Sequence, residues 1–208
     1  MNGILNILKP PGMTSSNVVV FVRKLLNIKR VGHSGTLDPA AAGVLPVFLG
    51  TATRLCEYAI NDNKEYIGEI CFGIGTDTQD AQGDIISKSD QVVELQEAQA
   101  LFESIRGTLQ QIPPQYSAIK KDGKKLYEYA RAGETVVVQP RQVEILESQV
   151  LRQSGDNRFM FRIVCSKGTY IRTICHDIGQ ACGANAHLSF LLRTQTGGFS
   201  IDDAVCLD

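Results

Sequence analysis

Polar and apolar residues alternate most regularly in the middle of the chain, along residues 64–72. Tyr66, Ile70 and Phe72 fall on one side of this stretch, whereas Glu65 and Glu69 fall on the other. A period of two is typical of a β-strand with one buried face. The stretches 143–151 and 158–165 alternate in the same way around a Gly-Asp-Asn turn, which predicts a hairpin.

Helices are predicted in five other places. Val18, Val22, Leu25 and Leu26 form an apolar stripe behind Thr14, Ser15 or Ser16, any of which can cap a helix ending near residue 27. Further helices are predicted over about 51–60, 95–105 and 126–131. Another follows Thr169 as its cap and reaches about residue 182. The stretch 73–83 is rich in Gly, Asp and Thr and is predicted to be a loop.

Composition is that of an ordinary globular protein. The 208 residues are 43% hydrophobic and 21% charged, and they lack any apolar run long enough to cross a bilayer. The N-terminus shows no secretory signal pattern, so we expect a cytoplasmic protein. The six cysteines form no C-x-x-C pair, which favours reduced, mostly buried thiols and no metal site; a metal site using His176 and Cys182 is a weaker alternative.

The formal net charge is only −1, but the basic residues are clustered. One cluster lies at residues 23–30 and a second at 120–125, where Lys120 and Lys124 stand on either side of an Asp-Gly turn. The second cluster is interleaved with Tyr116, Tyr127 and Tyr129. Cations for phosphates and rings for bases suit a surface that grasps an RNA strand, although a solvated basic hairpin has the same composition.

The most unusual stretch is 31–46, VGHSGTLDPAAAGVLP, in which glycines and prolines surround one carboxylate, Asp38. Gly35 permits backbone conformations closed to other residues, and Pro39 biases Asp38 toward extended or turn geometry. Taken alone, an Asp-Pro pair often does no more than open a turn.

The whole stretch nevertheless closely resembles motif II of the TruB family of tRNA pseudouridine synthases. The resemblance places the catalytic aspartate at Asp38 and implies that His33 fills the space left by a flipped base. Residues 8–15, LKPPGMTS, resemble motif I and make Lys9 a support of the catalytic cleft.

Three other segments extend the resemblance over nearly the entire chain. The KEY sequence at 64–66 implies that Tyr66 stacks on the target base. Residues 165–179 resemble motif III, which implies that Tyr170 and Arg172 enter the active site. In AHLSFLLRT, at 186–194, Leu191 matches a residue beneath the base, and Arg193 the second of two family arginines; Leu192 replaces the first.

A cation in the first turn of a helix is on the unfavourable end of the helix dipole. Arg172 should therefore have an anionic partner, and Asp38 is our candidate. An arginine beside Asp38 would also oppose the rise in pKa that a closed cleft imposes on a carboxylate.

The resemblance implies an α+β fold of the pseudouridine synthase type: a large, mixed, mostly antiparallel sheet flanked by helices. It further implies a thumb-like RNA-binding insertion over about 110–141, in which Lys120 and Lys124 contact the tRNA. Residues 1–208 would form one catalytic domain, and the C-terminal PUA domain that family members usually carry would be absent. The implied protein is a monomer without membrane contact.

The implied reaction isomerises uridine to pseudouridine at position 55 in the T loop of tRNA, after base flipping. No electron or group carrier takes part, so no cofactor and no metal is expected. Two alternatives are an RNA chaperone for tRNA folding and a subunit of a guide-RNA-dependent synthase. Glycoside hydrolysis would need a second carboxylate that the sequence does not pair with Asp38.

Overall fold

The structure, a computed structural model, describes residues 1–207. Within them, nine strands join one sheet whose hydrogen-bonded order is β1-β3-β12-β4-β11-β10-β7, with β2 paired to β3 and β13 to β12. β12 runs parallel to β3, whereas β1 and β2 are antiparallel to β3 and β7 is antiparallel to β10. Two hairpins, β5-β6 and β8-β9, stand apart from this sheet. The α+β class with a large, mostly antiparallel sheet is thereby confirmed.

The chain divides into two compact units, which are described one at a time. The first comprises residues Met1–Gly68, Arg162–Lys167 and the chain from Phe190 onward, and the second comprises Glu69–Phe161 and Gly168–Ser189. Three strands have residues in both units: β4 (Lys64–Phe72), β11 (Arg158–Cys165) and β12 (Ala186–Thr196). Among the described residues, no helix combines the length and apolarity that spanning a membrane requires.

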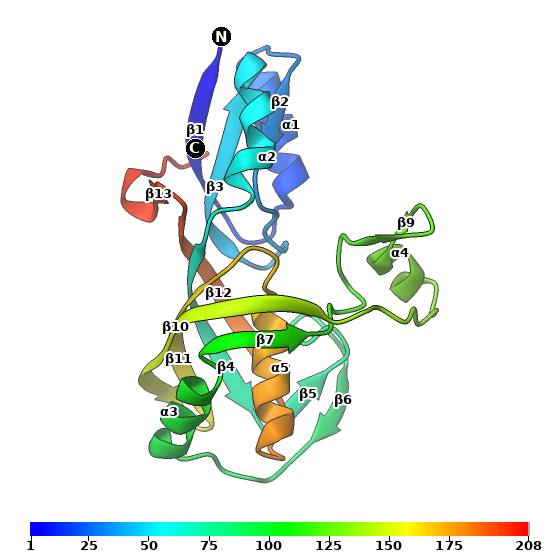
Figure 1. Cartoon of the computed structure of the whole chain (residues 1–208), viewed down its shortest axis with the longest axis vertical. Coiled ribbons are helices and arrows are strands. Elements are labelled where there is room, and N and C mark those ends of the chain that lie inside the picture. Colours follow the sequence, from blue (N-terminus) through cyan, green and yellow to red (C-terminus); the bar gives the residue numbers. More distant parts are fainter. Residues whose placement is uncertain (208) are drawn as a thin grey trace. The chain divides into compact units, whose positions relative to one another are not determined.

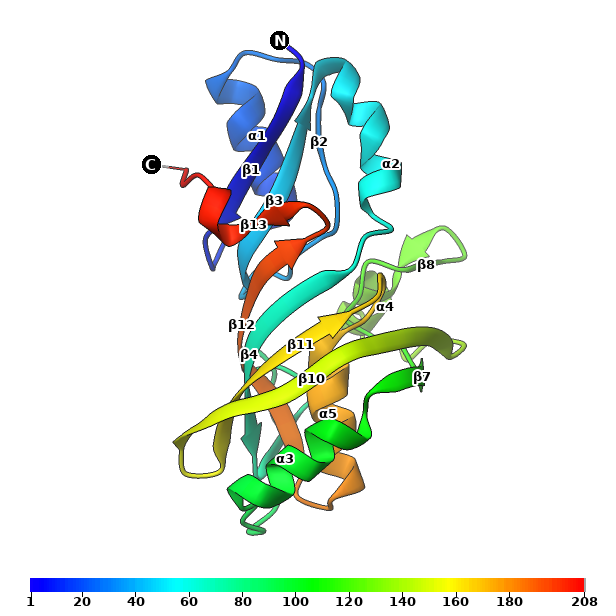
Figure 2. The same cartoon turned by 60° about the vertical axis from the view of Figure 1, so that its left-hand side comes forward.

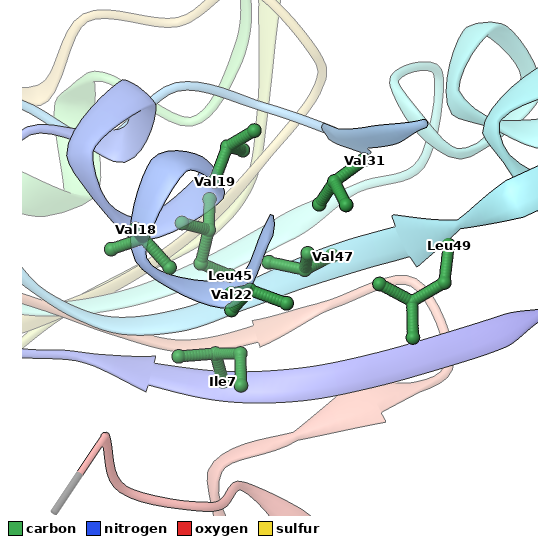
Figure 3. Close-up of a cluster of buried hydrophobic side chains, with 8 residues drawn as sticks. All are labelled: Ile7, Val18, Val19, Val22, Val31, Leu45, Val47 and Leu49. Atoms are coloured by element: carbon green, nitrogen blue, oxygen red, sulfur yellow. The ribbon is translucent and has the colours of Figure 1, made fainter. Parts of the chain in front are cut away.

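The first unit is built around β1 (Gly3–Lys9) and β3 (Ala42–Leu49), with α1 (Ser15–Leu25) packed on one face (Figures 1 and 3). Its other elements are β2 (Val31–His33), a 3-10 helix (Gly50–Leu55), α2 (Cys56–Ala59), β13 (Phe199–Ser200) and a second 3-10 helix (Ile201–Asp203). Thr14 caps α1 by accepting a hydrogen bond from Asn17 N–H at 3.0 Å, as predicted. The single helix predicted over 51–60 is wrong: a 3-10 helix occupies its first half.

Apolar side chains from three strands and α1 form the core of this unit. Figure 3 shows the cluster, which consists of Ile7, Val18, Val19, Val22, Val31, Leu45, Val47 and Leu49. Val18 and Val22 are one helical turn apart and so share a face, while Leu45, Val47 and Leu49 follow the strand period of two. Burying each such side chain contributes roughly 1.5–3 kcal/mol, so this cluster anchors the strands that carry the Asp38 loop.

The second unit contains α3 (Leu95–Ser104), β7 (Gly107–Gln111), β10 (Arg141–Gly155) and α5 (Ile171–Ala181), together with parts of β4, β11 and β12. Its remaining elements are β5 (Ile74–Thr76), β6 (Ile85–Lys88), β8 (Lys120–Lys121), β9 (Lys124–Lys125) and α4 (Leu126–Arg131). Ala98 and Phe102 are the buried residues of α3. Phe102 packs on Phe161 with ring centroids 4.9 Å apart, and Phe72 meets Phe159 edge to face at 5.9 Å.

Residues 112–140 leave the second unit's sheet at the end of β7 and return to it at the start of β10 (Figures 1 and 2). We call this segment the thumb. It carries the β8-β9 hairpin, in which Lys120 pairs with Lys125 and Lys121 with Lys124, and the short helix α4.

Two local predictions in the second unit are wrong. Residues 73–83 are not all loop, because Ile74–Thr76 form β5 and pair with β6, Ile74 opposite Lys88. Helix α5 is capped at Tyr170 rather than Thr169, and the Tyr170 side chain makes no capping hydrogen bond. In both cases a partner distant in sequence, not the local pattern, sets the boundary.

Candidate functional site

The Asp38 loop connects β2 to β3 and is held at the residues on either side of the carboxylate. Ser15 Oγ, which is buried, accepts a hydrogen bond from Leu37 N–H at 2.9 Å and donates one to Leu37 C=O at 3.2 Å. On the other side, Pro39 C=O accepts from Gly12 N–H at 2.8 Å. Asp38 is half-buried between these two anchors, and its C=O accepts from Ala41 N–H at 3.1 Å. The carboxylate therefore stands on a backbone whose position is fixed.

Lys9 ties motif I to this loop. Its Nζ donates to the carbonyls of Pro10 at 2.8 Å, Met13 at 2.7 Å and Pro39 at 3.3 Å. The side chain is almost completely buried, and burial lowers the pKa of Lys9 to about 8; the Asp38 charge raises that pKa and the Arg193 charge lowers it further. Lys9 is thus both a structural tie to the Asp38 loop and a cation near Asp38; its role as a support of the catalytic cleft stays a prediction.

Arg193 comes from β12, the strand that flanks β3 on the edge opposite to β1. It is 1% exposed, and it donates from Nε to Val44 C=O at 2.8 Å and from Nη2 to Gly35 C=O at 2.9 Å. In the sheet, Gly43 pairs with Lys9 of β1 and with Arg193 of β12. Residues directly opposite each other in a sheet project to the same face, so the register brings both cations to one side of β3.

Glycine is required at position 43 by this arrangement. Gly43 has a φ of 120°, and a Cβ there would lie 2.2 Å from the main-chain oxygen of Arg193. Any side chain would push β12 away from β3, and Arg193 would then lose its hydrogen bond to Gly35 C=O in the Asp38 loop.

Tyr66, Lys64 and His33 complete the surroundings of the loop within the first unit. Tyr66 is buried, and burial raises the pKa of its phenol while the charge of Arg193 and a hydrogen bond to it act in the opposite direction. Burial and the Arg193 charge lower the pKa of both Lys64 and His33. His33 is therefore neutral at pH 7, and its Nδ1 is buried without a hydrogen-bond partner among the described residues.

Leu191 is half-buried two residues before Arg193 on β12. Alternate residues of a strand share a face, so Leu191 projects to the side on which Arg193 reaches Gly35. Leu192, which replaces a family arginine, pairs with Ala42 on β3.

Tyr170 and Arg172 belong to the second unit, at the start of α5. Arg172 is 4% exposed and donates from Nη2 to Tyr116 C=O at 2.8 Å. Its Nη1 lies 3.8 Å from Asp80 Oδ2, and its Cζ lies 5.5 Å from the centre of the Tyr170 ring. The anion beside Arg172 within this unit is Asp80, which sequence reasoning missed. The pairing of Arg172 with Asp38, a residue of the first unit, stays a prediction.

The loop that carries Asp80 is itself fixed. Thr78 Oγ1 donates to Asp80 Oδ1 at 2.7 Å, and Thr173 of α5 donates to Gln79 Oε1 at 2.7 Å. In the sequence Asp80 is only one of the Asp residues of the predicted loop at 73–83, so its contact with Arg172 could be found only once α5 had been placed.

The thumb presents the predicted basic and aromatic residues on its surface. Lys120 and Lys124 are exposed, and Lys124 Nζ lies 5.6 Å from the centre of the Tyr129 ring. Lys125 and Arg131 lie 5.4 Å from the centre of the Tyr127 ring. Tyr116 OH donates to Asp77 Oδ2 at 3.4 Å, and burial and the Asp77 charge raise the pKa of Tyr116.

The described part of the chain was predicted to hold no metal, with His176 and Cys182 as the weaker alternative. Residues 1–207 contain no group of three or more His, Cys, Asp or Glu side chains that could hold an ion. Cys175 is buried and Cys182 half-buried.

Comparisons with known proteins identify the family. The model of the TruB family pseudouridylate synthase (N terminal domain) matches residues 23–171, and that of the tRNA pseudouridylate synthase B C-terminal domain matches residues 172–208. The chain belongs to the TruB family of pseudouridylate synthases. It is therefore an enzyme of the isomerase class.

Relatives support this membership over the full length of the chain. The chain is 48% identical over 211 residues to tRNA pseudouridine synthase B of Clostridioides difficile (strain 630), covering all of this chain and 70% of the relative. It is also 48% identical over 208 residues to the protein of that name from Alkaliphilus oremlandii (strain OhILAs), covering 69% of it.

Among solved structures, the chain is similar to one described as a Cbf5-Nop10-Gar1 complex. The TM-score is 0.78 at 32% identity, over 99% of this chain and 52% of the matched chain. This chain thus spans about half the length of that structural relative.

Proposed function

We propose that this TruB-family enzyme converts uridine 55 in the T loop of tRNA to pseudouridine, with Asp38 as the catalytic residue. The observation that carries the proposal is the Asp38 loop: its backbone is fixed by Ser15 and Lys9, and Lys9, Lys64 and Arg193 supply positive charge around it. Similarity to proteins named tRNA pseudouridine synthase B is the evidence for tRNA as the substrate.

The reaction is an isomerisation without change in composition. The bond between N1 and the ribose C1′ breaks, uracil rotates, and a bond forms between C5 and C1′; C5 loses a proton and N1 gains one. A base inside a folded loop must first be extruded before a side chain can reach it. We assign His33, neutral and half-buried, to the space that the base leaves.

Asp38 must be ionised to act. Nearby cations favour the charged form of a carboxylate. Lys9 and Arg193 share one face of the sheet beside the loop and supply such charge, and both are held by carbonyl acceptors that keep them in place. We assign Arg172 as a further cation for Asp38, itself positioned by Asp80 and by the Tyr116 carbonyl.

Tyr66 and Leu191 are assigned to hold the flipped uracil between them. The raised pKa of Tyr66 keeps its phenol neutral and able to donate a proton in a hydrogen bond. Tyr170 is assigned a contact with the substrate, and the exposed Lys120 and Lys124 of the thumb are assigned to tRNA phosphates.

The remaining parts of the proposal concern the protein as a whole. An internal rearrangement needs no electron or group carrier, so the proposal includes neither a cofactor nor a metal. We further propose a monomer that acts in the cytoplasm.

Release of tritium from tRNA labelled at uridine C5 tests this function, because the C5 proton is lost only when the new bond forms. We expect one equivalent of tritium from an unmodified transcript and none from a transcript with cytidine at position 55. Equal release from both transcripts, or none from the first, contradicts the proposal.

A second candidate is a synthase that works within a larger RNA–protein complex. The similarity to Cbf5 in its complex with Nop10 and Gar1 favours it. The assay separates the two candidates, because activity of the isolated chain on bare tRNA excludes any need for a guide RNA or a partner protein.

A further inference from the structure

Tyr170 is held by the two residues at which the thumb leaves and rejoins the sheet. Gln111 is the last residue of β7 and Arg141 the first of β10, and the two pair directly with each other. Opposed residues of an antiparallel pair project to the same face of the sheet. Both side chains therefore approach Tyr170 from one side.

Gln111 holds the backbone of Tyr170. Its side chain is 1% exposed; Nε2 donates to Tyr170 C=O at 3.1 Å, and Oε1 accepts from Tyr170 N–H at 2.8 Å. A carboxamide offers a donor and an acceptor at this spacing, whereas an ionised carboxylate offers acceptors alone. Because Tyr170 is the N-cap residue of α5 and its side chain makes no capping bond, this pair of hydrogen bonds fixes where the helix begins.

Arg141 holds the ring of Tyr170. The Arg141 Cζ lies 4.7 Å from the ring centroid, nearer than the Cζ of Arg172 at 5.5 Å. Arg141 Nε is buried and has no hydrogen-bond partner among residues 1–207, so the contact with the ring, not a hydrogen bond at that atom, accounts for its placement. Gly168 makes room for it, because a Cβ there would come within 3.3 Å of Arg141 Cζ.

One further hydrogen bond joins the start of the thumb to the same place, and a pair of hydrogen bonds joins the two ends of the thumb to each other. Tyr116 C=O accepts from Arg172, as described above. Gln115 clamps the returning strand, with Nε2 donating to Val136 C=O at 2.9 Å and Oε1 accepting from Val136 N–H at 3.0 Å. The thumb is therefore bonded to Arg172 through Tyr116, and its two ends adjoin Gln111 and Arg141, which contact Tyr170.

We infer that Gln111 and Arg141 are positioning residues for pseudouridine formation: they hold Tyr170 in place and couple it to the position of the thumb. The inference rests on the proposed function, since it assumes that the thumb contacts RNA and that Tyr170 contacts the target nucleotide. Binding of RNA to the thumb would thus determine the position of the Tyr170 side chain, which contacts the target base.

The test uses the full chain and a T-arm RNA labelled at uridine C5. Gln111→Glu removes the donor to Tyr170 C=O, and Arg141→Met removes the cation while keeping a long side chain. We expect the single-turnover rate to fall about 10-fold in each variant, while the Kd for RNA changes less than about 3-fold. Gln110→Glu and Arg152→Met, at exposed positions of the same two strands, should match the unsubstituted chain.

A double-mutant cycle separates positioning from a general structural role. If Arg141 acts through the Tyr170 ring, Arg141→Met has no further effect on the rate in a chain that already carries Tyr170→Ala. Losses that simply add overturn the inference, and so do single-variant rates within about 2-fold of the unsubstituted chain. Should Gln111→Glu fail to fold, the Arg141 cycle decides alone.

The two proposals fail in different ways. An unsubstituted chain that releases no tritium refutes the proposed function itself. If the unsubstituted chain is active and the Gln111 and Arg141 variants have the same single-turnover rate, only the positioning role of these two residues is refuted.

Discussion

The Asp38 loop and the thumb differ in what holds them. The Asp38 loop is fixed by buried side chains from distant parts of the chain, Lys9, Ser15 and Arg193, each bonded to its main-chain groups. The thumb is held largely by contacts within itself, through the β8-β9 hairpin and through cation–π contacts of exposed or half-buried lysines with tyrosines. A buried polar contact is costly to break, whereas an exposed one exchanges easily with water. The chain thus joins a loop held by buried contacts, to which we assign the chemistry, with a segment held largely by exposed contacts, to which we assign RNA binding.

Removing the Asp38 charge should produce the largest effect. Asp38→Asn keeps the size of the side chain but cannot ionise, so we expect turnover to fall by about 10³-fold or more while RNA affinity changes little. Tritium release measures the rate, and filter binding measures the Kd. Asp156→Asn, at an exposed turn, serves as the control. Near-normal turnover in Asp38→Asn would show that the chemistry lies elsewhere.

Arg193 tests whether the rigidity of the Asp38 loop depends on buried contacts. Arg193→Met leaves the carbonyls of Val44 and Gly35 without their donor, and we expect a loss of about 2–4 kcal/mol in the free energy of unfolding. Urea denaturation measures it, with Arg152→Met as the exposed control. A stability loss equal to that of the control would mean that the loop does not need this guanidinium.

The thumb should respond in the opposite way. Lys120→Ala with Lys124→Ala removes two exposed cations, so RNA should bind about 3–30-fold more weakly and the salt dependence of binding should become shallower. The melting temperature should stay unchanged, because neither side chain is buried. A large loss of stability with intact RNA binding would reverse the roles assigned to the two regions.

The smallest effect is expected from pH acting on His33. Its pKa is lowered in the folded state by burial and by the Arg193 charge, so on acidification the unfolded chain takes up a proton before the folded chain does. Stability should therefore fall as the pH drops below the usual value of about 6.5, by at most about 1.4 kcal/mol per pH unit from this group. NMR titration gives the pKa directly, and His33→Gln should flatten this part of the stability curve. A His33 pKa above 6.5 contradicts the prediction.

Much of the fold could be predicted because the patterns are local. The alternation along 64–72 matches β4, and the stripe behind Thr14 matches α1 with its cap. Short or Gly-rich elements were not predicted, because their conformation depends on a pairing partner. β5 is an example, since it forms a strand by pairing with β6. The first residue of α5 was mispredicted for a similar reason, because Gln111, 59 residues away, is hydrogen-bonded to Tyr170.

What the sequence determined by itself is the set of chemical groups: one carboxylate on a Gly- and Pro-rich loop, and basic and aromatic residues on a separate segment. Which groups meet was decided only by tertiary structure. Lys9 and Arg193 share a face because both pair with Gly43, and Arg172 lies near Asp80 because α5 packs beside that loop. Local patterns encode the period of an element and its ends. The register between strands depends instead on packing across the whole core, so no single stretch of sequence is sufficient to determine it.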